Sequence, residues 1–174
     1  MTTRMQAVSQ PTARGMVFIH STPAALCPHL EWALAAVLGT RVDLEWTAQP
    51  VETGSKRAEY SWTGPSGSSA SLASGLVGFG RVRFEVTEDA TTGSDGQRHA
   101  YTPSLGTFTT TVGVHGDILV GEDQIKQAIV RDALGREPIH SSLERLLGTP
   151  WDDELEVFRH ASEDAPVRWL HQVV

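Results

Sequence analysis

The densest group of potentially reactive side chains lies near the N-terminus and contains His20, Ser21, Cys27 and His29. A thiol beside a helix N-terminus and a histidine can be held as the thiolate, because the helix dipole and an imidazolium both favour the anion. Two histidines and a cysteine could also ligate a transition metal, if a fourth ligand came from elsewhere. The competing interpretation makes Cys27 a small buried residue and the two histidines caps of strand and helix ends. It is favoured, because free cysteines are usually buried and inert.

A second group of polar side chains follows a predicted turn at Asp95 and Gly96. It contains Arg98, His99 and Tyr101, and such residues can bind a carboxylate or a phosphate, because arginine presents a bidentate fork of donors. The alternative is a polar hairpin with an aromatic anchor. If the two groups meet at one edge of a sheet, they line a cleft for an anionic ligand or for a partner's acidic side chain. If they do not, they are caps and core residues.

Other motifs give little support for a cofactor or a metal ion. The glycine-rich segment 64–80 has neither the Gly-Lys-Ser/Thr nor the Gly-x-Gly-x-x-Gly pattern of a phosphate-binding loop. Its amides at 66–68 could bind an anion before a helix, but a plain turn is favoured. The acidic run 151–156 lacks the spacing of a calcium loop, and acids in a first helical turn are expected from the helix dipole. Gly-x-Ser-x-Gly and His-Glu-x-x-His motifs are absent from the sequence. We therefore predict no cofactor and no metal.

Apolar periodicity indicates the elements that must position these side chains, because strands alternate at every second residue and helices repeat every three or four. The first half is predicted to contain a strand at 15–20, a helix at 26–38 that Pro28 either kinks or starts, strands at 41–46 and 57–62, a helix up to Gly78 and a strand at 81–87. This β-α-β-β-α-β order is the split βαβ, or ferredoxin-like, arrangement, with two helices on one face of a four-stranded antiparallel sheet. We predict it for residues 15–88.

The second half, residues 89–174, is predicted to hold short strands and two or three helices. The strands are expected at 99–101 and 106–112, and the helices at 121–134, at 138–147 and from Thr149, where a capping signature begins. The last segment, 166–174, has β character and is expected to return to a sheet edge. Residues 1–14 lack apolar periodicity and are predicted to be a disordered tail, so that a chain starting at Gly15 should keep its melting temperature. The fold class is α+β, with residues 15–174 as one domain.

Composition excludes several classes of protein. Of the 174 residues, 40% are hydrophobic, which can supply a core, and no apolar run is long enough to span a membrane. The net charge of −7 gives no electrostatic basis for binding nucleic acid or an anionic membrane. One cysteine cannot form an internal disulfide. These features predict a soluble cytoplasmic protein that binds neither nucleic acid nor membrane.

Several strings in the sequence resemble one known family. They are VFIHSTPAALCPHLEWA (17–33), RFEVTE (83–88), DGQR (95–98), YTPSLG (101–106), HGDI (115–118), LLGTPWDDELE (146–156) and PVRWLHQVV (166–174). Over about residues 15–174, the chain is similar to the actinobacterial domain-of-unknown-function 3145 family. This resemblance implies no activity and no catalytic residue. It does imply a link to fatty-acid synthesis, with an acyl carrier or a synthase as partner.

The leading functional hypothesis is a non-catalytic binding or regulatory domain for a protein partner or a small anionic metabolite. The reason is that no set of nucleophile, base and oxyanion donors can be assembled from local sequence. Two alternatives are kept open: a small enzyme that uses Cys27 with His20 or His29, and a structural or assembly subunit. A homodimer is also left open.

Overall fold

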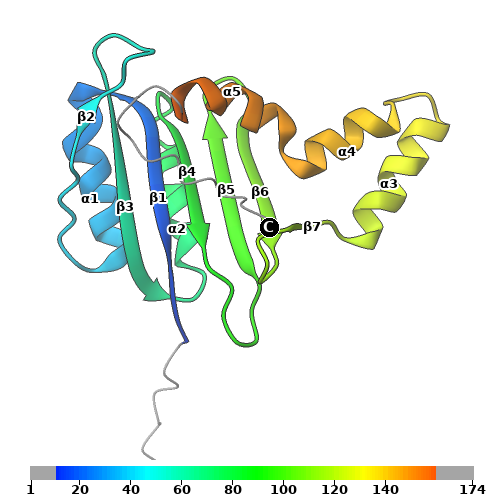
Figure 1. Cartoon of the computed structure of the whole chain (residues 1–174), viewed down its shortest axis with the longest axis horizontal. Helices are drawn as coiled ribbons and strands as arrows, with labels where there is room; N and C mark the ends of the chain where they lie inside the picture. Colours follow the sequence, from blue (N-terminus) through cyan, green and yellow to red (C-terminus); the bar gives the residue numbers. More distant parts are fainter. Residues whose placement is uncertain (1–10, 160–174) are drawn as a thin grey trace, which may run out of the picture.

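A seven-stranded antiparallel sheet forms the centre of the protein, with the strand order β2-β3-β1-β4-β5-β6-β7 (Figure 1). The computed structural model describes residues 11–159. Its strands are β1 (Thr12–Pro23), β2 (Thr47–Ala48), β3 (Ser55–Pro65), β4 (Arg83–Glu88), β5 (Gly96–Thr102), β6 (Gly106–Val112) and β7 (Ile118–Leu119). Its α-helices are α1 (Cys27–Leu38), α2 (Ser68–Val77), α3 (Glu122–Ala133), α4 (Ile139–Leu147) and α5 (Thr149–Arg159). The predicted α+β class is confirmed.

The main core lies between the sheet and the helices α1 and α2. These helices pack against each other on one face of the sheet (Figure 1). There, Leu34 and Leu72 join Val17 and Phe84 in one cluster of buried apolar side chains. Because successive strand residues point to opposite faces, this placement fixes the direction of every other side chain on β1 and β4. Their intervening side chains point to the opposite face.

The opposite face of the sheet is crossed by α5, which contacts β5 and β1. A second, smaller apolar cluster forms there from Ala100, Phe108, Trp151 and Leu155. The Trp151 indole N–H donates a hydrogen bond to the carbonyl of Gly106 at 2.9 Å. Gly148 lies between α4 and α5 with φ +78°, and a Cβ there would lie only 2.5 Å from the Phe108 ring. The close approach of this turn to β6 therefore requires glycine.

The helices α3 and α4 form an arm that extends away from the sheet beyond β7 (Figure 1). They contact each other, and α4 also contacts α5. Glu137, in their connection, binds Arg131, Ser142 and Arg145. Several large apolar side chains of this helical arm are at least 36% exposed, namely Ile125, Ile129, Val130, Leu134, Ile139 and Leu147. The arm thus carries apolar surface that its own packing leaves uncovered.

The segment 41–46 differs from its predicted strand. Val42 and Leu44 are buried, in keeping with the alternation, but within the described part of the chain the segment is not in a strand, and β2 covers only 47–48. The reason is Glu31 of α1, whose carboxylate accepts the backbone N–H of Leu44 at 3.0 Å and the indole N–H of Trp46 at 2.9 Å. The segment is therefore bonded to a helix and not to a strand edge.

The structure moves the predicted start of the first strand and decides between two predicted starts of the first helix. β1 begins at Thr12, before the predicted start at Gly15, and Ala13 is 2% exposed. The first helix starts at Cys27 with Pro28 in its first turn, so the proline starts the helix and does not kink it. The predicted strand 166–174 and residues 1–10 of the predicted tail lie outside the described residues.

Candidate functional site

The most deeply buried charge on the α5 face is Glu85, in the middle of β4. Its neighbours Phe84 and Val86 point into the main core, so the alternation of β4 turns Glu85 toward α5. The side chain is 1% exposed. A buried carboxylate of this kind requires several donors, because transferring an unpaired charge out of water costs many kcal/mol.

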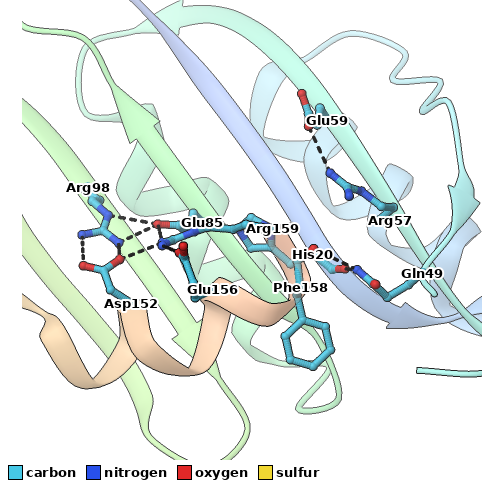
Figure 2. Close-up of polar contacts among 10 residues, drawn as sticks. All are labelled: His20, Gln49, Arg57, Glu59, Glu85, Arg98, Asp152, Glu156, Phe158 and Arg159. Carbon is cyan, nitrogen blue, oxygen red and sulfur yellow. Dashed lines mark hydrogen bonds and ion pairs between the residues drawn. The ribbon is translucent and has the colours of Figure 1, made fainter. Parts of the chain in front are cut away.

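Three cationic or polar side chains supply those donors (Figure 2). His20 Nε2 lies 2.7 Å from one carboxylate oxygen of Glu85. Arg98 donates from Nη2 at 2.6 Å and from Nε at 3.1 Å, and Arg159 donates from Nη2 at 2.7 Å and from Nε at 3.1 Å. β1, β5 and the end of α5 therefore meet at one carboxylate of β4.

Asp152 closes the arrangement from the first turn of α5. Its carboxylate accepts Arg98 Nη2 at 2.6 Å and Arg159 Nη2 at 2.8 Å. Two carboxylates and two guanidiniums thus alternate around a ring, and their formal charges cancel. We call this set, together with His20, the ion cluster: His20, Glu85, Arg98, Asp152 and Arg159.

The electrostatics of the ion cluster keep Glu85 and Arg98 charged. Burial alone would raise the pKa of Glu85, but the hydrogen bond from His20 and the charges of Arg98 and Arg159 hold that pKa well below its usual range. Burial would lower the pKa of Arg98, and the charge of Glu85 and the hydrogen bond to Asp152 raise it instead. The Arg98 fork, which the sequence suggested for an external anion, is thus bound to two internal carboxylates.

Hydrogen bonds beside the ion cluster connect β1 to the loop before β3 and to α5. The Gln49 side-chain N–H₂ donates to the carbonyl of His20 at 2.6 Å and to that of Phe158 at 3.3 Å (Figure 2). The Ser21 hydroxyl donates to Glu52, and this bond, together with a second from Ser55, lowers the pKa of Glu52. The bond from Gln49 to Phe158 joins the C-terminal end of α5 to this loop.

The remaining predicted site residues lie on the other face, with α1 and α2. His99 bonds Ser69 through Nε2 at 3.3 Å and Thr109 through Nδ1 at 3.0 Å, and burial lowers its pKa. The Tyr101 ring stacks on Phe84, with a centroid distance of 5.4 Å. Alternation along β5 therefore separates Arg98 from His99 and Tyr101, and the predicted single cleft is not formed.

Cys27 and His29 also lie away from the ion cluster, on α1. Burial, followed by the charge of Glu31, raises the pKa of the Cys27 thiol. His29 is exposed and packs edge-on against Trp32 at 5.3 Å between ring centroids. His20, by contrast, bonds Glu85 on the α5 face. The two histidines and the thiol are thus placed in three different environments, and the geometry gives no support to a thiolate held by an imidazolium.

The other motifs also bind internal groups. The helix N-terminus at 66–69 does take an anion, but the anion is the chain's own Glu88, which accepts the N–H groups of Gly67 at 2.8 Å and Ser69 at 3.1 Å. These bonds hold the pKa of Glu88 below its ordinary value against the effect of burial. Among residues 11–159, no group of three or more possible metal ligands is close enough to hold an ion. No helix in that range is both long and apolar enough to cross a membrane.

Comparison with protein families gives a match that covers residues 16–172 and carries the description "protein of unknown function (DUF3145)". The chain belongs to this family. The match extends over the described sheet from Met16 onward, the helical arm and most of the C-terminal segment beyond Arg159. Comparisons of this DUF3145 chain with curated proteins and with solved structures found no match.

Sequence reasoning missed three members of the arrangement, namely Glu85, Asp152 and Arg159. A charged residue between Phe84 and Val86 was one available signal, because a strand covered on both faces cannot leave a charge unpaired. The spacing of Asp152, Glu156 and Arg159 at i, i+4 and i+7 was a second signal, since it places all three on one side of a helix. The dipole interpretation of the acidic run concealed this stripe.

Proposed function

We propose that the protein is a non-catalytic binding domain whose partner docks on the helical arm. The observation that carries this proposal is the apolar surface of α3 and α4, where Val130 is 55% and Leu134 is 59% exposed. Apolar surface left exposed in this way is a candidate interaction site. The ion cluster supports a structural role instead, because its cations are bound to its own carboxylates.

The partner that fits this surface is a protein that presents an amphipathic helix. Val130, in the last turn of α3, and Leu134, directly after that helix, are four residues apart. Rows with this spacing form the ridges against which another helix packs. α3 and α4 leave this row exposed, and a helix from the partner would cover it.

A matched pair of substitutions tests the proposal. Val130→Glu changes the arm, and Val157→Glu makes the same change on α5 at nearly the same exposure, 55% against 56%. We expect the wild type and Val157→Glu to retain a stoichiometric partner in native pull-down from the source cells, and Val130→Glu to lose it. The partner segment protected from proteolysis in the complex should be an amphipathic helix.

Two results would contradict the proposal. One is a partner retained equally by Val130→Glu and Val157→Glu, which would place the binding surface elsewhere. The other is a purified chain that is dimeric by light scattering and becomes monomeric with Val130→Glu, since a second copy would then cover the arm. Circular dichroism of both variants checks that their folds are intact.

We also infer that the N-terminal half has the ferredoxin-like arrangement. The order β2-β3-β1-β4, antiparallel throughout, supports this inference, as do two crossover helices on one face. β5, β6 and β7 then extend that sheet at the β4 edge.

A further inference from the structure

The outer edge of β6 is one of two sheet edges that the described strands cover only in part. β5 pairs with β6 over seven residues, but β7 pairs only with Thr111 and Val112. Within residues 11–159, β6 thus has no strand partner on this side between Gly106 and Thr110. Uncovered edges are sites where another extended segment can pair, and natural proteins usually cover or blunt them.

The backbone groups on this edge can be assigned from the turn that follows. The N–H of Gly113 donates to the carbonyl of Asp117 at 2.8 Å, on the β7 side. Because the backbone groups of successive residues in a strand point to opposite sides, Thr111, Thr109 and Thr107 direct theirs to the β7 side. Phe108 and Thr110 direct theirs to β5. Two consecutive outward-facing residues, Thr107 and Thr109, can therefore accept a new strand.

A groove of about 400 Å³ lies along the same edge. It is lined by the β6 threonines, by Leu119 and Val120 after the turn, and by Arg145 and Leu146 of α4. None of the six apolar residues on which the proposed function depends lines it. The groove is thus a separate surface, on the side of the arm that faces the sheet edge.

We propose that the groove and the outer edge of β6 bind the chain's own C-terminal segment, Pro166–Val174, as an added antiparallel or parallel strand. The segment contains Val167, Trp169, Leu170, Val173 and Val174 and no glycine, a composition typical of strands. Its proline is its first residue, where a strand tolerates the missing N–H. The DUF3145 match continues to residue 172, so this segment belongs to the shared domain.

The connection is long enough for this placement. α5 ends at Arg159, whose guanidinium binds Glu85 on β4. A strand added outside β6 lies three strand positions from β4, or ~14 Å at the usual spacing. The connecting residues 160–165 can span up to ~20 Å when extended. The opposite edge, where β2 pairs with only two residues of β3, lies at a similar distance, but the groove lies at β6.

Amide hydrogen exchange of the full chain, measured by NMR, tests the placement at single residues. We expect the outward amides of Thr107 and Thr109 to be protected in the wild type. Leu170→Pro, which disrupts a strand at this segment, should speed their exchange by ~10-fold or more, since the opening that exposes them becomes easier. Ser162→Pro, in the connection, is the matched control and should leave both rates unchanged. The amides of Phe108 and Thr110, which face β5, should stay protected in all three chains and show that the sheet is intact.

Each alternative occupant gives a different result, and each would overturn the proposal. Exchange of Thr107 and Thr109 at unprotected rates in the wild type means that no segment covers the edge. Equal protection of these two amides in the wild type and in Leu170→Pro means that another segment covers the edge. Protection that is lost on dilution, together with dimers in light scattering, means that the segment comes from a second copy. Faster exchange at β3 in place of β6 in Leu170→Pro would assign the segment to the other edge.

Discussion

Replacing Glu85 with glutamine tests whether the ion cluster holds α5 on the sheet. The substitution keeps the size of the side chain and one acceptor oxygen but removes the negative charge. Arg98, which is 3% exposed, would then keep Asp152 as its carboxylate partner. Arg159 and His20 would each lose their contact with the Glu85 carboxylate. Glu85→Gln therefore leaves buried positive charge undercompensated.

The stability that Glu85→Gln is expected to lose is large for a single substitution. Breaking a buried ion pair by removing one partner costs about 3–5 kcal/mol. For a domain of this size, each kcal/mol lowers the melting temperature by roughly 2–4 °C, so the melting temperature should fall by roughly 6–20 °C. We expect the free energy of unfolding, measured by urea titration with circular dichroism, to fall accordingly. Hydrogen exchange should speed up first in α5, whose end is held by Arg159.

A matched control and a double substitution separate this effect from a general cost of removing a carboxylate. Glu122→Gln removes a carboxylate that pairs with Lys126 on the surface and is 80% exposed, and it should change the free energy by less than about 1 kcal/mol. Glu85→Gln with Arg98→Met should cost less than the sum of the two single substitutions, because each single one removes an ionic partner of the other residue. A loss for Glu85→Gln no larger than that for Glu122→Gln would refute the reasoning.

Three further outcomes are expected from the structure. The free energy of unfolding should fall as the pH drops below about 5, because Glu52, Glu85 and Glu88 have lowered pKa values and the unfolded chain binds protons first. Urea titrations from pH 7 to pH 3 measure this, and a free energy that does not change with pH would contradict it. The Cys27 thiol should react with a disulfide reagent at pH 7 much more slowly in the folded than in the urea-unfolded chain, because its pKa is raised and it is buried. A chain starting at Gly15 should lose about 1–3 kcal/mol of stability relative to one starting at Pro11, since it lacks the buried Ala13 and three residues of β1. Equal melting temperatures of the two chains would instead support the sequence-based start of the domain at Gly15.

The elements of this fold could be predicted because their periodicity is local. Leu30 and Leu34 mark one face of α1, and alternation marks β3 and β4, so each pattern can be recognised within its own segment. The segment 41–46 shows the limit of that inference. Its alternation reports which side chains are buried, but Glu31 of α1 decides what the backbone bonds to, and that choice depends on a contact between separate elements.

The arrangement of the site depends on which face of the sheet each residue occupies, and a sequence pattern does not show this. Arg98 and His99 are adjacent in the chain, and for that reason they cannot share a face of β5. The same rule places Arg98 with Glu85 and Asp152, residues 13 and 54 positions away, whose carboxylates bind its guanidinium. A charged residue on a strand covered on both faces must therefore find its counter-charge on a neighbouring strand or on the element that covers it. Here α5 supplies Asp152 and Arg159, so the ion cluster holds this helix against the sheet.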